Sequence, residues 1–344
     1  MNIGEFRMLY SADIKRFALD LGFLDCGIIP ANVFGEYNQA LDERINKFPQ
    51  SRSLYERLYR NARQSDAAKS VIVCTTGFGD YLSYESLKHR VGRFYLFDGR
   101  INYSNEYRSR LEFETFLKTL GLGILNDSVP ARLAAAKAGI GKFGRNNFLY
   151  DPVHGSNVMV YTWVVDEQLE YDDIASDYYL PICNDGCNKC IDSCPTKALS
   201  GSFEMDMGKC IARIVTTPTE EELPKGVTLE QLGTWIYGCD ACQEVCPANI
   251  VKFDEMREFP LLEAHLKFLS LEEILDMNED VYSHVVNPRF WYAGEEALWL
   301  WKCNALRSMV NSGDPKYHSL IEQYCEHDDE RIRAIALWGR SKMQ

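Results

Sequence analysis

Apolar residues recur with helical spacing in two segments of the first 125 residues of the chain. Residues 11–22 predict a helix with Ser11 as its N-cap, because serine favours that position and the apolar residues after it share one face. Residues 105–123 predict a second helix that a glycine ends. The inward faces consist of Ile14, Phe17, Ala18 and Leu21 in the first helix and of Leu111, Phe116, Leu117 and Leu120 in the second.

Three shorter apolar runs predict strands. Residues 23–29 and 70–76 read "FLDCGII" and "SVIVCTT", and polar or glycine residues end both runs. Residues 156–166 read "SNVMVYTWVVD", with apolar side chains on both alternations, which predicts a strand buried on both faces. Helices and strands in this order predict an α/β arrangement for the N-terminal part.

The C-terminal part has the pattern of paired amphipathic helices. Residues 294–314 and 328–343 each begin with acidic residues and continue with helical spacing, and residues 315–327 lie between them. Pairs of this size are similar to HEAT repeats, although a plain helical subdomain has the same periodicity. We therefore expect an α+β chain of three parts: 1–174 (α/β), 175–255 and 256–344 (HEAT-like helices).

Composition narrows the function classes. The 344 residues carry a formal net charge of −13, which disfavours unselective binding to phosphate backbones. The chain has no run of about 18 apolar residues, so we expect no membrane span. The sequence starts without the apolar core of a signal peptide, so we expect a cytoplasmic protein. Dense cysteine in a reducing compartment favours metal or redox chemistry over disulfides.

Eight of the twelve cysteines gather between residues 183 and 246. The first run is Cys183-x3-Cys187-x2-Cys190-x3-Cys194-Pro195 and the second is Cys239-x2-Cys242-x3-Cys246-Pro247, with Cys210 between them. Both endings match the bacterial ferredoxin run, whose last cysteine binds the neighbouring cluster. This rule predicts a ferredoxin-like domain with two [4Fe-4S] clusters. One cluster takes Cys183, Cys187, Cys190 and Cys246, and the other takes Cys194, Cys210, Cys239 and Cys242.

The alternative for these runs is zinc, which prefers paired C-x2-C knuckles, and the C-x3-C-P endings do not follow that pattern. The first run departs from the ferredoxin spacing by one residue, which Gly186 can accommodate. Residues 216–232 interrupt the second run and predict a surface loop with a short helix. The remaining four cysteines, Cys26, Cys74, Cys303 and Cys325, have mostly apolar neighbours and are expected to be small buried side chains.

The glycines of "AGIGKFGRNN", Gly139, Gly141 and Gly144, have the spacing of a dinucleotide fingerprint. An alanine-rich helical stretch precedes them instead of a strand, so we reject dinucleotide binding. We expect them to end a helix and to let the backbone approach a flat or bulky group, and the alternative is a helix C-cap with a surface turn. Donors would come from Lys142, Arg145, Asn146 and Asn147. The six histidines have no metal-ligand spacing and are expected to be structural or exposed.

These motifs occur in a recognisable order. "DSVPARLAAAKAGIGKFGRNNFLYDPVHGSNVMV" is followed by "CNDGCNKCIDSCPTKAL", "GCDACQEVCPAN" and "WKCNALRSMVNSGD". The order resembles epoxyqueuosine reductases and, more loosely, reductive dehalogenases. The resemblance implies a nitroreductase-like N-terminal layer that holds cobalamin without a histidine ligand. Single electrons would reach it through the clusters. The implied cofactor-binding residues are Gly139, Gly141, Lys142, Arg145, Asn146, Gly155 and Ser156.

The resemblance also implies a proton donor, Asp127 in "NDSVP", whereas the sequence alone allows Asp127 to be an N-cap for the helix near Pro130. The stretch from Asp127 to Gly139 is shorter than in the family and lacks the Glu-Arg pair that follows the proline there. The segment "RFYLFDGRINY" lacks the family's histidine. Implied partners are an electron donor such as flavodoxin or ferredoxin and a small-molecule or modified-nucleoside substrate. A tRNA substrate fits poorly with the net charge.

Two other functions are compatible with the cysteine runs. The first is a ferredoxin-like carrier that serves a partner enzyme and has no substrate of its own. The second is a structural double-cluster protein with a helical docking layer. The motif that precedes the cysteines favours the reductase over both.

Overall fold

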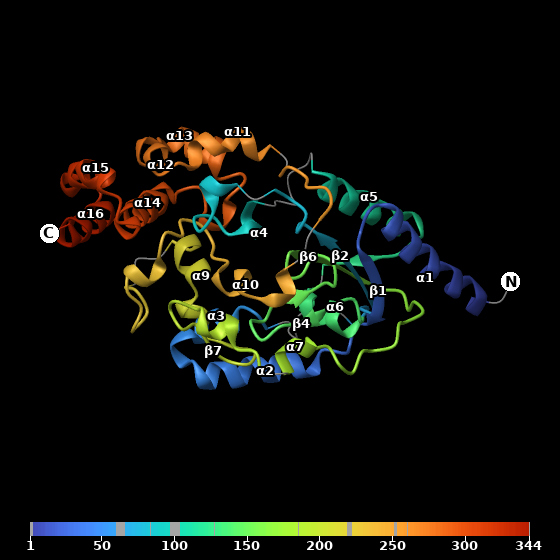
Figure 1. The fold of residues 1–344 in the computed structure, drawn as a ribbon. Helices are drawn as coiled ribbons and strands as arrows, with labels where there is room; N and C mark the ends of the chain where they lie inside the picture. The colour runs from blue at the N-terminus through green and yellow to red at the C-terminus, as the bar shows by residue number, and fades with distance from the viewer. Residues whose placement is uncertain are drawn as a thin grey trace.

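A four-stranded antiparallel sheet forms the centre of the N-terminal part (Figure 1). Its order is β1-β2-β6-β3, with β1 (Asp25–Pro30), β2 (Ser70–Gly77), β3 (Ile124–Leu125) and β6 (Val158–Val165). The computed structural model describes residues 3–59, 66–82, 84–96, 104–126, 128–184, 186–218, 222–250, 253–259 and 261–343. The three predicted strands are therefore neighbours in one sheet, and the short β3 forms its far edge.

Helices cover both faces of this sheet. Helices α1 (Ile3–Asp20) and α5 (Asn105–Thr119) pack on one face, where Ile14, Phe113 and Trp163 belong to one apolar cluster. Helix α6 (Ala131–Lys137) packs on the other face through its alanines. The β-branched residues of β2 alternate between these two clusters, so the sheet is the middle of three layers.

Three details of the expected helices and strands are wrong. Ser11 is not an N-cap, because α1 begins at Ile3 and the Ser11 hydroxyl donates to the carbonyl oxygen of Glu170 at 3.3 Å. Leu111 is 42% exposed, and Phe113, which is fully buried, occupies the inward position on α5. Strand β6 is fully buried only over its last three residues, because no layer covers its first half as closely.

Short elements surround the cysteines. These are α7 (Pro181–Asn184), α8 (Lys189–Asp192), β7 (Leu199–Gly201), β8 (Glu204–Met205), α9 (Ile211–Thr216) and α10 (Ala241–Glu244). Helices α2 (Gly35–Lys47), α3 (Arg52–Glu56) and α4 (Arg93–Leu96) and the hairpin of β4 (Lys142–Phe143) and β5 (Leu149–Tyr150) join them to the sheet. Few of these elements exceed two turns, so their positions depend on side-chain contacts and, in the loaded protein, on metal ligation.

The C-terminal helices gather at the upper left of Figure 1, on the far side of the molecule from α1. They are α11 (Leu262–Leu266), α12 (Leu271–Asp276), α13 (Glu279–Val281), α14 (Leu298–Ser312), α15 (His318–Gln323) and α16 (Glu330–Lys342). Their core surrounds Trp301 on α14 and also includes Phe78 and Tyr237. The helices thus share one core with the segment after β2 and with the segment before Cys239. None of the described helices combines the length and the apolar character that crossing a bilayer requires.

Candidate functional site

The first set of cysteines surrounds a small cavity. Its walls include Cys183, Cys187, Cys190 and Cys246, together with Arg145, Asn146, Tyr150 and Lys189. Three of these cysteines come from the first run, on α7, α8 and the loop between them, and Cys246 comes from the end of the second run. The structure thus places the last cysteine of the second run with the first run, as the ferredoxin rule predicts.

The second set consists of the other four cysteines of the unit. Burial raises the pKa of the Cys239 and Cys242 thiols, and the negative charges of Cys210 and Cys194 raise both values further. Such mutual effects require these thiols to lie close to one another. Cys194 ends the first run but lies with the second set, just as Cys246 ends the second run but lies with the first set. Each run therefore contributes its last cysteine to the opposite set.

Main-chain N–H groups point at several of the sulfurs. Burial raises the pKa of Cys190 to about 11, whereas N–H groups of Cys190 and Ile191 oppose this shift. The N–H groups of Ala212 and Arg213 act in the same way on Cys210. Donors in these positions stabilise the negative charge that thiolate ligands retain in a cluster. Both sets therefore fit an iron-sulfur cluster by their donor atoms and their surroundings.

These sets do not have the arrangement of a mononuclear site. Among the described residues, no group of three or more His, Cys, Asp or Glu side chains is placed to hold one metal ion. Tetrahedral zinc needs each thiolate at about 2.3 Å from one centre, whereas a cubane core separates its four thiolates more widely.

Arg145 and Asn146 contact the cysteine loops. Arg145 donates from Nη1 to the carbonyl oxygen of Cys187 at 3.1 Å. Asn146 donates from Nδ2 to the Tyr150 hydroxyl at 2.9 Å and to the carbonyl oxygen of Cys242 at 3.2 Å. These two residues therefore connect the β4–β5 hairpin to both sets of cysteines.

Gly155 and Ser156 make a second connection to the cysteine unit. The Ser156 N–H donates to Oδ1 of Asn249 at 2.7 Å, and the Ser156 hydroxyl donates to Oε1 of Gln243 at 2.8 Å. Gly155 has a φ of +59°, and a Cβ there would lie 2.2 Å from Oδ1 of Asn249. Only glycine permits this approach of the β5–β6 turn to the segment after Cys246.

The other predicted cofactor residues belong to the turn after α6. Gly139 follows α6 with a φ of +76°. This conformation is typical of a glycine that ends a helix, which was the alternative expected for this position. A Cβ on Gly141 would lie 2.8 Å from Cγ of Leu149, so this glycine lets β4 approach β5. Lys142 pairs with Asp177 at 3.2 Å. A helix precedes these glycines, which agrees with the rejection of a dinucleotide site.

Of the residues predicted to hold a corrinoid, Arg145 and Asn146 line one cavity, that of the first cysteine set. Asp127 lies outside the described residues. Within the described residues, Pro130 occupies the N-cap position of α6 and makes no side-chain capping bond, and the role of Asp127 stays a prediction.

A different group of side chains faces the second set of cysteines. Burial and the charges of Tyr292 and Cys210 raise the pKa of Tyr95 on α4. The ring centroids of Tyr95 and Tyr292 are 5.5 Å apart, and both residues act electrostatically on Arg132, on the first turn of α6. Tyr95, Arg132 and Tyr292 thus lie near one another on separate segments, and Arg132 and Tyr292 are exposed. Their hydroxyl and guanidinium donors suit the amide-rich rim of a corrinoid.

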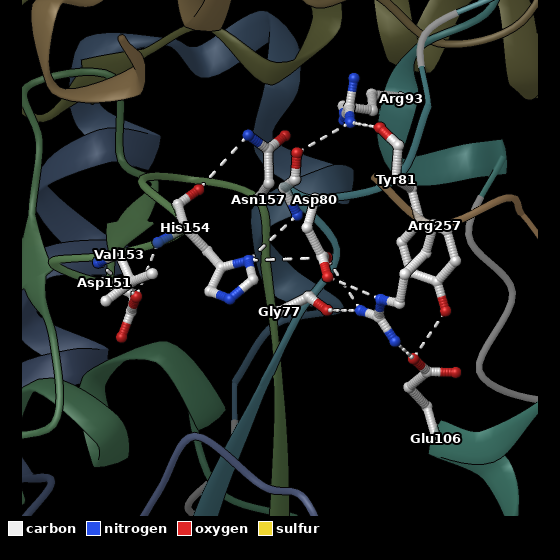
Figure 2. Close-up of polar contacts among 11 residues, drawn as sticks. Gly77, Asp80, Tyr81, Arg93, Glu106, Asp151, Val153, His154, Asn157 and Arg257 are labelled. Carbon is white, nitrogen blue, oxygen red and sulfur yellow. Dashed lines mark hydrogen bonds and ion pairs between the residues drawn. The ribbon is translucent and has the colours of Figure 1, made fainter. Parts of the chain in front are cut away.

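A larger polar cavity of about 560 Å³ lies beside the end of β2, with Asp80, Glu106, His154 and Arg257 among its walls. Figure 2 shows Arg257 between Asp80 and Glu106. Its Nε and Nη2 donate to the two carboxylate oxygens of Asp80 at 2.6 and 2.8 Å, and its Nη1 donates to Glu106 at 3.1 Å. Burial alone would raise the pKa of Asp80, but Arg257 outweighs burial and lowers it.

His154 stands against the glycines of the segment "GFGD", residues 77–80. A Cβ on Gly77 would lie 2.4 Å from the imidazole ring, and the Gly79 N–H donates to Nδ1 of His154 at 3.2 Å. Burial lowers the pKa of His154, so its neutral form prevails at neutral pH. Sequence analysis missed this arrangement, because its members are far apart in the chain. The paired glycines of "GFGD" were the only local signal.

Arg93 connects this cavity to the second set of cysteines. Its main-chain N–H donates to Oδ2 of Asp240 at 2.6 Å, and its Nη2 donates to the carbonyl oxygen of Gly79 at 2.9 Å. Asp240 directly follows Cys239. The cavity wall and the second cysteine run therefore share one hydrogen-bonded network.

Comparisons with known proteins agree with this geometry. The family model described as "4Fe-4S double cluster binding domain" matches residues 183–249. This match, together with the two cysteine sets, defines an iron-sulfur protein with a double-cluster domain. An epoxyqueuosine reductase of Leadbetterella byssophila is 30% identical over 290 residues, covering 80% of this chain and 91% of its own length. One of Cellulophaga algicola is 31% identical over 301 residues, covering 82% and 94%. The chain belongs to the epoxyqueuosine reductase family.

Solved structures show the same fold. Epoxyqueuosine reductase from Bacillus subtilis superposes with a TM-score of 0.72 at 21% identity, covering 97% of this chain and 90% of the other. The enzyme from Streptococcus thermophilus gives a TM-score of 0.73 at 17% identity, covering 98% and 90%. The predicted family, the mixed α and β fold and the double-cluster domain are therefore confirmed.

Proposed function

We propose that this protein is an iron-sulfur oxidoreductase that passes single electrons through two [4Fe-4S] clusters to a cobalamin that reduces a substrate. The observation that carries the proposal is the exchange of Cys194 and Cys246 between the two cysteine sets. The proposed ligands are those expected from the sequence: Cys183, Cys187, Cys190 and Cys246 for one cluster and Cys194, Cys210, Cys239 and Cys242 for the other. When bound, the clusters supply one-electron transfer and the cobalamin supplies a strong reductant.

The chain's own residues keep the two cluster loops at a fixed separation. Arg145 and Asn146 hold the loops from the β4–β5 hairpin, and Ser156 holds them from the turn before β6. We propose that Arg145, Asn146, Gly155 and Ser156 serve the clusters instead of a corrinoid. Gly139, Gly141 and Lys142 then act indirectly, by shaping the hairpin that presents Arg145 and Asn146.

The two cysteine sets differ in their surroundings, which gives electron transfer a direction. Exposed Lys189 and half-buried Cys187 line the cavity of the first set, so an external donor such as a flavodoxin or a ferredoxin would deliver electrons there. The second set faces Tyr95, Arg132 and Tyr292. We propose that these three residues hold the corrinoid, in place of those expected from the sequence.

We propose that the substrate reacts on the side of the second cysteine set that faces Tyr95, Arg132 and Tyr292. Arg132 follows Asp127 by five positions at the start of α6, so we retain Asp127 as the proposed proton donor. A solved relative is described with an epoxyqueuosine-modified tRNA stem loop. We propose a modified nucleoside as the substrate class. The net charge of −13 disfavours unselective RNA binding and requires any RNA contact to be local.

Finer features of the fold remain part of the proposal. These are the nitroreductase-like character of residues 1–174, the ferredoxin-like character of residues 175–255, the HEAT-like character of residues 256–344, and a cytoplasmic location. Residues 78–96 pack with the C-terminal helices, so we expect the first and third parts to unfold together.

A second candidate is an electron carrier without a substrate of its own. It is favoured by one observation: the polar groups of Arg145, Asn146 and Ser156, expected to bind a corrinoid, are engaged with the cysteine loops.

Anaerobic reconstitution with iron, sulfide and cobalamin separates the two candidates. The reductase retains two four-iron clusters and one cobalt per chain after gel filtration, and the carrier retains the clusters alone. If Arg132→Ala no longer binds cobalt but keeps its iron content, the result supports the proposal that Tyr95, Arg132 and Tyr292 hold the corrinoid. A protein that binds cobalt equally well with Arg132→Ala would contradict it.

A further inference from the structure

One face of α14 holds the segment that joins Cys210 to Cys239. The donors are side-chain groups of α14, and the acceptors are main-chain carbonyl oxygens between residues 215 and 236. Asn304 donates to Val215 and Ile236, Arg307 to Gly233 and Trp235, Ser308 to Thr234, and Asn311 to Leu229 and Gly233. Because Cys210 and Cys239 belong to the same set, α14 fixes the backbone that brings them together.

Arg307 differs from the other donors because it carries a charge into the interior. It is only 1% exposed. Burial lowers its pKa to about 9, which still leaves the guanidinium protonated at neutral pH. Within the described part of the chain, no carboxylate forms an ion pair with Arg307, and its hydrogen bonds go to carbonyl oxygens and to Oδ1 of Asn304. A buried cation without an anionic partner is costly, so a counter-charge elsewhere is expected.

An apolar cluster connects the residue that Arg307 binds to Cys239 of the second cysteine set. Trp235, whose carbonyl Arg307 binds, packs in an apolar cluster with Ile211, Val215 and Leu232, and Cys239 packs against the same cluster. An apolar layer screens charge poorly, so a charge on one side is felt on the other. Four thiolates outweigh the positive charge of an iron-sulfur core, so the ligated cluster is an anion that becomes more negative on reduction.

We propose that Arg307 is a positioning residue that raises the reduction potential of the cluster held by Cys194, Cys210, Cys239 and Cys242. This inference rests on the proposed function, because it requires clusters at both cysteine sets. The buried positive charge stabilises the reduced cluster more than the oxidised one. Arg213 also lies near Cys210 but is only half-buried, so water screens it more than Arg307.

The test is a redox titration of the reconstituted protein, followed by electron paramagnetic resonance of each cluster. Arg307→Gln keeps amide donors for the carbonyl oxygens and removes the charge. We expect it to disfavour reduction of the second cluster at least tenfold, about 59 mV for one electron, and to leave the first cluster near its wild-type potential. Arg307→Lys keeps the charge and should stay near wild type. Asn311→Ala, which removes two neutral hydrogen bonds from the same segment and none from Arg307, is the matched control and should not shift the potential.

Two results would overturn the proposal: a wild-type potential in Arg307→Gln, or an equal shift in Asn311→Ala, which would assign the effect to backbone position. If Arg307→Gln does not retain the second cluster, the potential measured in Arg307→Lys tests the proposal instead. A shifted potential of the second cluster in Arg307→Lys also overturns it. Wild-type protein that takes up fewer than two clusters would instead refute the proposed function on which this inference depends.

Discussion

The side-chain amide of Asn146 donates to the main-chain carbonyl of Cys242 at 3.2 Å. This bond joins a residue of the β4–β5 hairpin to the second cysteine run, 96 positions away. Asn146 is 2% exposed, so water cannot replace the bond if it is lost. The first motif of the family is thereby tied to the redox unit.

Replacement of Asn146 by alanine should loosen the cysteine unit. The variant loses the bonds to Tyr150 and Cys242 and leaves buried polar groups without partners, at a cost of about 1–3 kcal/mol. Urea unfolding of the reconstituted protein and the rate of iron release to a chelator measure the effect. Lys142→Gln, which removes an exposed ion pair on the same hairpin, is the control and should change stability by less than about 1 kcal/mol. Equal effects of the two variants would contradict the assigned role of Asn146.

Gly77 should not tolerate a side chain. Alanine there would place Cβ 2.4 Å from the His154 ring, so the imidazole must move and its bond to Gly79 is lost. We expect a loss of about 1–3 kcal/mol in the free energy of unfolding, the range for overpacked sites. Gly35→Ala is the matched control, because no atom lies within 4 Å of a Cβ at that position. If both variants unfold at the same urea concentration, the close packing of His154 against Gly77 is contradicted.

His154 should make stability depend on pH. Burial lowers its pKa below the ordinary value of 6.5, so the unfolded chain binds this proton more readily than the folded one. The stabilisation is complete above pH 6.5 and is lost as the pH falls below it, until the folded-state pKa is reached. Urea unfolding of His154→Gln between pH 8 and 5.5 should show a shallower loss of stability than wild type. Parallel profiles would show that His154 titrates normally in the folded protein.

Asp127→Asn tests the proposed proton donor. The substitution keeps size and polarity but cannot donate a carboxylic proton, so turnover should fall by about 10²–10⁴-fold. Optical spectra of the clusters should stay unchanged, because the ligands lie elsewhere. Turnover at the wild-type rate would remove Asp127 from the mechanism.

Local periodicity predicted the sheet, its flanking helices and the helical C-terminal part, because the patterns are determined by nearest neighbours in sequence. Predictions from periodicity failed at positions whose environment is determined by contacts with residues far away in the sequence. Ser11 lies inside α1, which begins at Ile3, and its hydroxyl bonds to the main chain of Glu170 instead of capping the helix. Phe113 takes the inward position expected of Leu111, and Trp163 packs against it. The ferredoxin rule placed Cys246 beside the first run, and Cys246 lines the same cavity as Cys183 and Cys190; the assignment of ligands to clusters stays a prediction. The cavity around His154 could not be predicted, because its walls come from segments that only the fold brings together.

Exchange of Cys194 and Cys246 between the two clusters is the central claim, and single serine substitutions at these positions test it most directly. Electron paramagnetic resonance of reduced, reconstituted protein should show that Cys246→Ser alters the cluster of the first run, as Cys190→Ala does. Cys194→Ser should alter the cluster of the second run, as Cys242→Ala does, and Cys325→Ala should alter neither. If Cys246→Ser instead changes the same signal as Cys242→Ala, each run binds its own cluster and the account is contradicted.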